Sequence, residues 1–94
     1  MQKGEAAAVL ITNTSLPDMS GFELARYVRR QFPCLRVIFL TDTPNLAEAQ
    51  QAVRCGAYDY LPKSDGIDAL RSAMIRVSEE LHTESREEAY LRGQ

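Results

Sequence analysis

Hydrophobic and polar positions divide this chain into three short apolar runs and three longer segments with a helical period. The first run, residues 7–12, is apolar on both faces, as a strand covered on both sides must be. Two more runs, 36–41 and 58–61, share its β-branched and aromatic character. Strands that alternate with helices are typical of βαβ units, so the pattern predicts an α/β fold of three parallel strands and three helices.

Capping residues mark where the predicted helices begin. Ser20 and Glu23 form an S-x-x-E capping box for the first helix. Asn45 and Glu48 give a similar signal for the second helix, and the third helix begins near residues 65–68.

The residues expected to face the sheet recur at steps of three and four. They are Leu24, Ala25, Val28 and Phe32 in the first helix, Leu46, Ala49, Ala52 and Val53 in the second, and Ile67, Leu70, Met74, Val77 and Leu81 in the third. The third stripe fits a coiled-coil seam as well as a core-facing side. We favour the core, because a parallel sheet needs helices on its faces.

Composition narrows the class of protein. The 94 residues suffice for one small domain, with 45% hydrophobic and 26% charged residues. A net charge of -2 argues against direct nucleic-acid binding, and no apolar run approaches the length of about 18 residues that suggests a membrane span. Cys34 and Cys55 have neither zinc-site nor redox-motif spacing, which predicts two buried or half-buried free thiols in a reducing cytoplasm.

Polar side chains stand where the predicted strands end. The ends of the three runs carry, in turn, Asn13, Thr41 with Asp42, and Tyr60 with Lys63. Ligands of open α/β sheets bind at the carboxyl ends of the strands, so these residues form a candidate site. Simpler roles compete: Thr41 can cap its strand, Lys63 can be solvated or pair with Asp42, and Tyr60 can serve packing alone.

Three segments in this order and spacing resemble the receiver domain of response regulators in two-component signalling. They are LPDMSG (16–21), VIFLT (37–41) and GAYDYLPK (56–63). The resemblance runs from about residue 7 to residue 81 and implies a flavodoxin-like, CheY-like fold. The chain would hold the third to fifth strands and helices of that fold. Residues 1–81 would then form a partial receiver-like domain, and residues 82–94 a helical tail or linker.

The resemblance also implies roles at single positions. Asn13 stands where a receiver has the aspartate that accepts a phosphoryl group from a histidine kinase. Thr41 matches the hydroxyl that binds a phosphoryl oxygen, and Lys63 matches the ammonium group that neutralises another. Tyr60 matches the aromatic side chain that moves inward with that hydroxyl and reports the state to partners.

Two departures from the family pattern predict a pseudo-receiver that cannot be phosphorylated. The amide of Asn13 is a poor nucleophile and brings no charge to a metal ion. The family's opening strand, which is followed by the acidic metal ligands, has no counterpart in the pattern. We therefore expect no enzymatic activity, no catalytic residue, no metal site and no cofactor.

Two alternatives stay open. The chain could be a fragment or mutant of a phospho-accepting response regulator, with Asp replaced by Asn at position 13, such as the regulatory part of a transcriptional regulator. A weaker alternative is a ligand-sensing pseudo-receiver that uses the empty phosphate pocket for a small molecule.

The partners follow from the same pattern. We expect protein partners: a histidine kinase, an attached output domain, or a second copy of the chain, in the cytoplasm and without direct contact to nucleic acid or membrane. The surface near residues 46–53 and 58–74 would make these contacts. Residues 6–12 lack charge, Pro and Gly, the profile of a sheet edge that pairs with another chain. A homodimer or strand-swapped assembly is expected rather than a stable free monomer.

Overall fold

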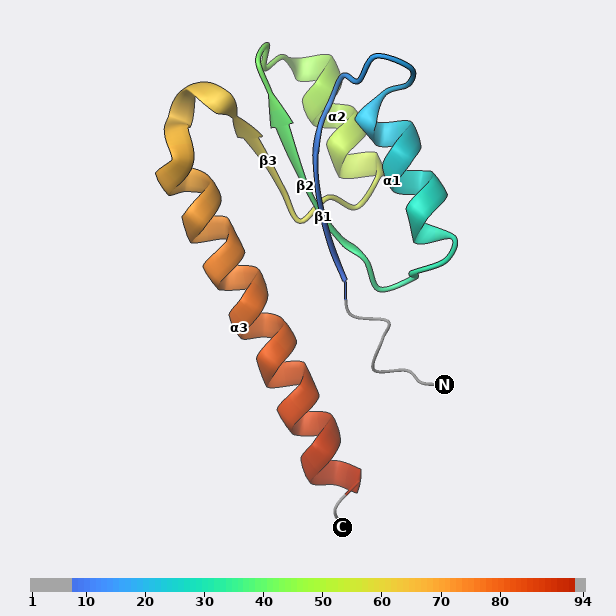
Figure 1. Cartoon of the computed structure of the whole chain (residues 1–94), viewed down its shortest axis with the longest axis vertical. Helices are drawn as coiled ribbons and strands as arrows, with labels where there is room; N and C mark the ends of the chain where they lie inside the picture. The colour runs from blue at the N-terminus through green and yellow to red at the C-terminus, as the bar shows by residue number, and fades with distance from the viewer. Residues whose placement is uncertain (1–7, 93–94) are drawn as a thin grey trace.

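The computed structural model describes residues 8–92 of the chain, and the side chains of residues 8–81. Its elements are β1 (Val9–Asn13), α1 (Gly21–Arg29), β2 (Arg36–Thr41), α2 (Leu46–Arg54), β3 (Asp59–Pro62), the 3-10 turn η2 (Lys63–Asp65) and α3 (Gly66–Arg92). The strands form one parallel sheet in the order β1-β2-β3 (Figure 1). The predicted α/β fold with three parallel strands and three helices is confirmed.

Strand pairing sets the ends of the strands. Residues 36–41 form β2 as predicted. Strands β1 and β3 each end one residue later than their apolar runs, and they begin later too, at Val9 and Asp59. Asn13 belongs to β1 because it pairs with Leu40, and Pro62 belongs to β3 because it pairs with Thr41. The expected first residue of the first strand, Ala7, lies outside the described residues.

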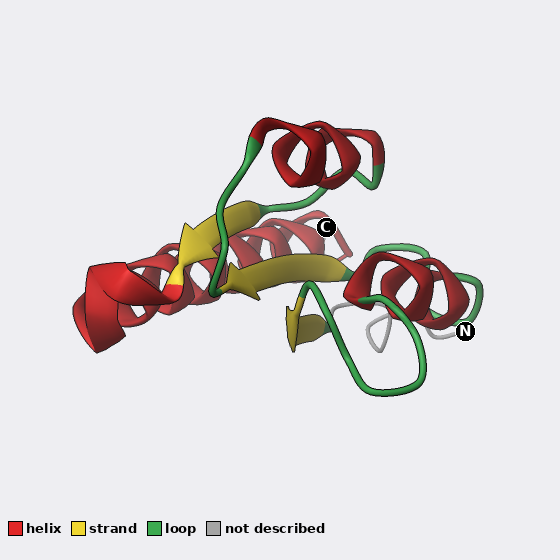
Figure 2. Cartoon of the chain, turned by 90° about the horizontal axis from the view of Figure 1, so that it is seen from above, coloured by secondary structure: helices red, strands yellow, loops and turns green. Residues whose placement is uncertain are grey.

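Helices cover both faces of the sheet, and each face has its own core (Figure 2). The core between the sheet and the helices α1 and α2 contains Phe22, Ala25, Leu35, Val37, Phe39, Ala52 and Cys55. The core between the sheet and α3 contains Ile38, Ala73 and Val77. Successive residues of β2 therefore point to opposite faces, as the two-residue period of a strand requires.

The capping residues behave as the sequence predicts. Ser20 and Glu23 form the reciprocal capping box of α1, with 3.0 Å between the Glu23 nitrogen and Ser20 Oγ. The side chain of Asn45 accepts from the Glu48 backbone N–H at 2.8 Å at the start of α2. Two orphan N–H groups at the helix starts thus have partners.

The inner stripe of α1 was predicted only in part. Ala25 is fully buried, and Leu24 and Val28 are half-buried. Phe32 is 38% exposed because α1 ends at Arg29, before that position. Phe22, which the stripe omitted, is buried instead and stacks against Phe39, with 4.6 Å between the ring centroids.

The prediction for α2 was wrong at both ends of the stripe. Leu46 and Val53 are 73% and 79% exposed, whereas Ala52 is buried and Ala49 half-buried. The helix is rotated so that Glu48, beside these alanines, reaches the ends of the strands. The two large apolar side chains consequently face away from the sheet.

The stripe of α3 packs in its middle. Val77 is fully buried, and Leu70, Met74 and Leu81 are half-buried against the same core. Ile67, at the start of the helix, is 66% exposed, contrary to the prediction. Ala73 was not predicted but lies fully buried between α3 and the sheet.

The two cysteines differ in their surroundings. Both are free; Cys55 is buried as expected, but Cys34 is exposed in the turn before β2, which corrects the prediction for that thiol.

A close approach of backbones joins α1 to the end of β1. The Gly21 N–H donates to the backbone oxygen of Thr14 at 2.9 Å. A Cβ atom on Gly21 would overlap the backbone oxygen of Asn13 and would lie 3.3 Å from the methyl carbon of Thr12. Only glycine fits this position without a shift of the main chain.

We predict that Gly21→Ala lowers the free energy of unfolding by about 1–3 kcal/mol, as overpacked substitutions do. Alanine is the better helix former, so propensity alone would act in the opposite direction. Urea denaturation checks the prediction, with Gln50→Ala on the exposed side of α2 as the control. A Gly21→Ala protein as stable as the wild type would contradict the close approach.

Candidate functional site

The carboxyl ends of the strands gather three of the four predicted site residues in one pocket. Asn13, Thr41 and Lys63 line a cavity of about 260 Å³. The other lining residues are Thr14, Ser15, Leu40, Asp42 and Thr43. The arrangement follows from the parallel pairing, which aligns the carboxyl ends of β1, β2 and β3 at one edge of the sheet.

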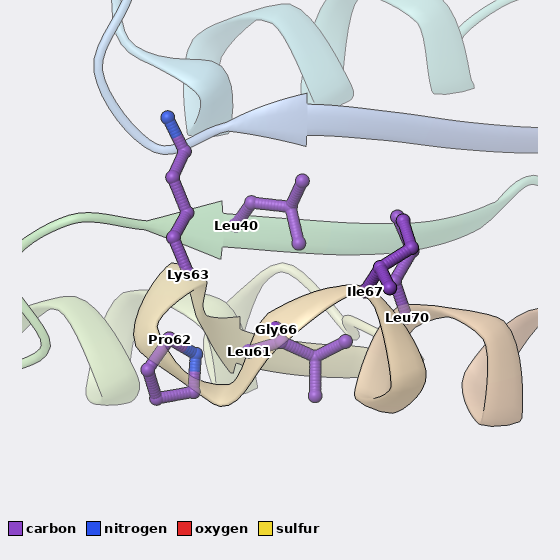
Figure 3. A pocket seen from close by; sticks show the side chains of 7 residues that line it. All are labelled: Leu40, Leu61, Pro62, Lys63, Gly66, Ile67 and Leu70. Atoms are coloured by element: carbon purple, nitrogen blue, oxygen red, sulfur yellow. The ribbon is translucent and has the colours of Figure 1, made fainter.

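Lys63 contributes its charge to the rim of this pocket. Its side chain extends from the start of η2 across the end of β2 toward the loop after β1 (Figure 3). The ammonium nitrogen lies 3.5 Å from a carboxylate oxygen of Asp42, the pairing named as an option from the sequence. Both side chains are exposed, by 40% and 76%, so the pair contributes little to stability.

Thr41 is buried and caps the end of β2. The sequence suggested two roles for it, a cap of the strand and a hydroxyl that binds a phosphoryl oxygen, and the cap is the simpler one. Its hydroxyl oxygen accepts from the Thr43 backbone N–H at 3.0 Å. The same hydroxyl donates to Glu48 Oε1 at 2.8 Å. Its donor and one of its two acceptor positions are therefore in use.

Glu48 is the residue that sequence reasoning missed at this site. Besides Thr41, its carboxylate accepts from the Tyr60 hydroxyl, at 2.8 Å to Oε1, and from the Thr14 hydroxyl, at 3.0 Å to Oε2. We call these four residues the Glu48 cluster. The sequence placed Glu48 only as a partner of the N-cap; its position beside Ala49 and Ala52, on the inner side of α2, was the signal that could have revealed it.

Tyr60 does not line the pocket but is joined to it through Glu48. Its hydroxyl donates to Glu48 and also accepts from the Asn45 backbone N–H at 3.3 Å. Tyr60 thereby connects β3 to the first turn of α2, while its ring packs against the core under α1 and α2. Tyr60 therefore contributes to the packing of this core and also donates a hydrogen bond to Glu48.

Hydrogen bonding sets the charge state of the cluster. Burial raises the pKa of Glu48, but the hydrogen bonds from Thr41, Tyr60 and Thr14 outweigh it, and the pKa lies below its ordinary value of 4.5. Burial and the hydrogen bond to Glu48 raise the pKa of Tyr60 above 10.0. At neutral pH a carboxylate therefore faces three neutral hydroxyl donors.

A second, mostly apolar pocket of about 190 Å³ lies on the side of the sheet that carries α3 (Figure 3). Its lining residues are Leu40, Leu61, Pro62, Lys63, Gly66, Ile67 and Leu70. Most of these residues fall within the contact surface expected at 58–74. Lys63 borders both pockets and, among the residues whose side chains the structure describes, is the only charged one that lines this pocket.

The site contains few groups for metal binding. Within the described part of the chain, no three His, Cys, Asp or Glu side chains lie together as a metal ion would need. Asn13 offers the pocket a neutral carboxamide.

In the described part of the chain, none of the helices combines the length and apolar character needed to cross a membrane.

The depressed pKa of Glu48 predicts a loss of stability in acid. A carboxyl group whose folded pKa lies below its unfolded value stabilises the fold above pH 4.5, and the contribution disappears as the pH falls through the folded value. We expect wild type to be more stable than Glu48→Gln at neutral pH, with the difference shrinking in acid. Urea denaturation at a series of pH values measures this. Glu79→Gln, at an exposed position on α3, is the matched control. A difference between wild type and Glu48→Gln that does not change with pH would contradict the prediction.

Known proteins share both the sequence pattern and the fold of this chain. A family model described as the response regulator receiver domain matches residues 1–75. NtrC, a DNA-binding transcriptional regulator of Proteus hauseri, is 41% identical over 64 residues, which cover 68% of this chain and 14% of NtrC. The response regulator protein PilR of Pseudomonas aeruginosa is 33% identical over 79 residues, which cover 84% of this chain and 18% of PilR.

Solved structures agree with these relatives. The REC domain of AraT, a response regulator from Geobacillus stearothermophilus, is 34% identical with a TM-score of 0.72, and the match covers 82% of this chain and 60% of that one. The signal receiver domain of an HD domain-containing protein from Pseudomonas fluorescens is 28% identical with a TM-score of 0.71, covering 81% and 62%. The family match spans more than half of the chain and the fold agrees with it, so the chain belongs to the response regulator receiver domains of two-component signalling.

Proposed function

We propose that this chain is a receiver module that accepts no phosphoryl group, has no enzymatic activity, and acts in bacterial-type signal transduction through protein–protein contacts. One observation carries the proposal. Asn13 stands at the carboxyl end of β1 and faces the pocket that also contains Thr41 and Lys63. The position at which an acyl phosphate would form therefore carries a carboxamide.

The chemistry of an amide supports this proposal. An acyl phosphate forms when a carboxylate oxygen attacks phosphorus, and an amide oxygen is a much weaker nucleophile. An amide also supplies no negative charge to a hard divalent cation. Thr41 and Lys63 keep the positions of phosphate-binding groups, but both already have partners in Glu48 and Asp42.

Exposed apolar side chains on α2 and α3 favour a binding role. Leu46 and Val53 on α2 and Ile67 on α3 are each more than 60% exposed. They lie within or next to the surface expected at residues 46–53 and 58–74. The proposed partners are a histidine kinase, an attached output domain or a second copy of the chain, in the cytoplasm and without direct contact to DNA.

The relatives favour a second candidate, the regulatory part of a transcriptional regulator with Asn in place of the phospho-accepting Asp. NtrC is a DNA-binding transcriptional regulator, and this chain spans only 14% of its length. In that case the module would still make protein contacts, but Asn13→Asp would restore phosphorylation in a chain that supplies the acidic metal ligands.

Incubation with acetyl phosphate and Mg²⁺ tests whether the pocket accepts a phosphoryl group. We expect no mass gain in wild type, because an amide is a weak nucleophile. We expect none in Asn13→Asp either, because the described residues hold no cluster of acidic side chains for the metal ion that the reaction needs. Intact-protein mass spectrometry is the measurement. A gain of one phosphoryl group by wild type would refute the proposal, and a gain by Asn13→Asp alone would favour the second candidate.

The edge of the sheet at β1 supports self-association. The Thr14 N–H and the Ala8 carbonyl oxygen bond to β2, at 2.9 Å each. Backbone groups alternate in direction along a strand, so those of Val9 and Ile11 point away from β2. The side chain of Ile11 is 40% exposed. An uncharged edge of this kind is a template for another strand.

We predict that the chain dimerises through β1 and that Ile11→Lys shifts it to a monomer by placing a charge on the edge. Sedimentation velocity at micromolar concentrations measures the state. Ile75→Lys is the matched control, because Ile75 is a similarly exposed isoleucine, on α3, at 50%. A wild-type monomer that melts cooperatively would contradict this prediction.

A further inference from the structure

The Glu48 cluster joins α2 to the ends of all three strands. Thr14 follows β1, Thr41 ends β2 and Tyr60 lies in β3, and each donates its hydroxyl proton to the carboxylate of Glu48. The three partners are 34, 7 and 12 residues away in the sequence. Hydrogen bonds from hydroxyls to an ionised carboxylate are among the stronger ones in proteins.

Two of the hydroxyls, those of Tyr60 and Thr41, each donate one hydrogen bond and accept another. The Tyr60 hydroxyl accepts from the Asn45 N–H, and the Thr41 hydroxyl accepts from the Thr43 N–H. Each hydroxyl therefore uses its donor on Glu48 and one acceptor position on the backbone of the segment before α2. A rotation of either side chain would break both bonds, so each has one favoured conformation.

Ionised Glu48 suits this arrangement because it only accepts hydrogen bonds. Its two oxygens receive three donors, and a protonated carboxyl or an amide would place a donor against one of the hydroxyls. The charged groups near Thr41 are Asp42 and Lys63, which pair with each other. The other groups contributed by β1, β2 and β3 to the cluster are the neutral Thr14, Thr41 and Tyr60.

We propose that Glu48 serves as an internal anion that holds Thr41 and Tyr60 in one conformation without any phosphoryl group, and so fixes the surface of α2 and β3 in its partner-binding form. The inference rests on the proposed function and deepens it, because it says what sets the conformation of the binding surface. The exposed side chains of Leu46 and Val53 follow from the same rotation of α2 that brings Glu48 inward.

Amide hydrogen exchange of the full chain tests the inference, because the N–H groups of Asn45 and Thr43 report where the two hydroxyls are. In Glu48→Ala we expect both amides to exchange about tenfold faster, the factor that corresponds to about 1.4 kcal/mol. Amides inside β2 should keep their rates. Gln51→Ala, an exposed position on the same helix, is the matched control and should change neither amide.

Tyr60→Phe separates the two hydroxyls. This change removes the acceptor of the Asn45 N–H and one of the three donors to Glu48, but it leaves the bond from the Thr43 N–H to Thr41 in place. Asn45 should therefore lose protection while Thr43 keeps it. Unchanged exchange of Asn45 and Thr43 in Glu48→Ala would overturn the inference. Equal acceleration of every amide in the sheet would overturn it too, since Glu48 would then support the whole fold and not this conformation.

Wild-type protein gives a test that does not depend on the variants folding. In an acid titration followed by NMR, the Glu48 carboxyl carbon and the amides of Thr43 and Asn45 should shift with one midpoint. Chemical shifts of the Thr43 and Asn45 amides that stay constant while Glu48 titrates would overturn the inference. A phosphoryl mass gain would instead refute the proposed function and leave these amide readings standing, so the two failures are distinguishable.

Discussion

Parallel pairing of three strands is the constraint on which the rest of this structure depends. The register of β1 with β2 and of β2 with β3 places Asn13, Thr41 and Lys63 around one pocket, although 50 residues separate the first from the last. The side chains on both faces of β2 are buried, so a slip by one residue would turn the apolar set of each face toward the other. The same strand register therefore sets the positions of the core residues and of the residues that line the pocket.

The carboxylate of Glu48 adds a polar constraint to this apolar frame. Buried hydroxyls need partners, and Thr14 and Thr41 are both buried at the ends of strands. A single residue of α2 provides an acceptor for both and for Tyr60. The rotation of α2 that brings Glu48 to these hydroxyls also turns its larger apolar residues outward and Ala52 toward the core.

Receiver domains share a fold and a set of site residues. This chain matches the fold, whereas its site has a carboxamide, that of Asn13, at the end of β1. Its three strands and three helices match solved receiver domains. Thr41 ends β2, Tyr60 lies within β3, and Lys63 follows β3 at the start of η2. Asn13 ends β1, and the resemblance to the family assigns it to the position of the phospho-acceptor. A fold supports many functions, so a protein-binding role for this chain depends on that residue and on the exposed apolar side chains of α2 and α3.

Much of this protein was determined by its sequence alone. The period of the apolar residues gave the fold class, Ser20 and Asn45 gave the starts of two helices, and the ends of the apolar runs gave Asn13 and Thr41 as site residues. These features are local, because capping and strand period depend on residues close together in the chain.

Only the tertiary structure decided which side of each helix faces the sheet and what Glu48 does. Leu46 and Val53 satisfied the helical period but are exposed, and Phe22 lay outside the predicted stripe but is buried. A period shows that a helix has an apolar side, whereas its rotation depends on contacts with strands far away in the sequence. The bond between Glu48 and Thr14 spans 34 residues, and no local pattern encodes a contact of that range.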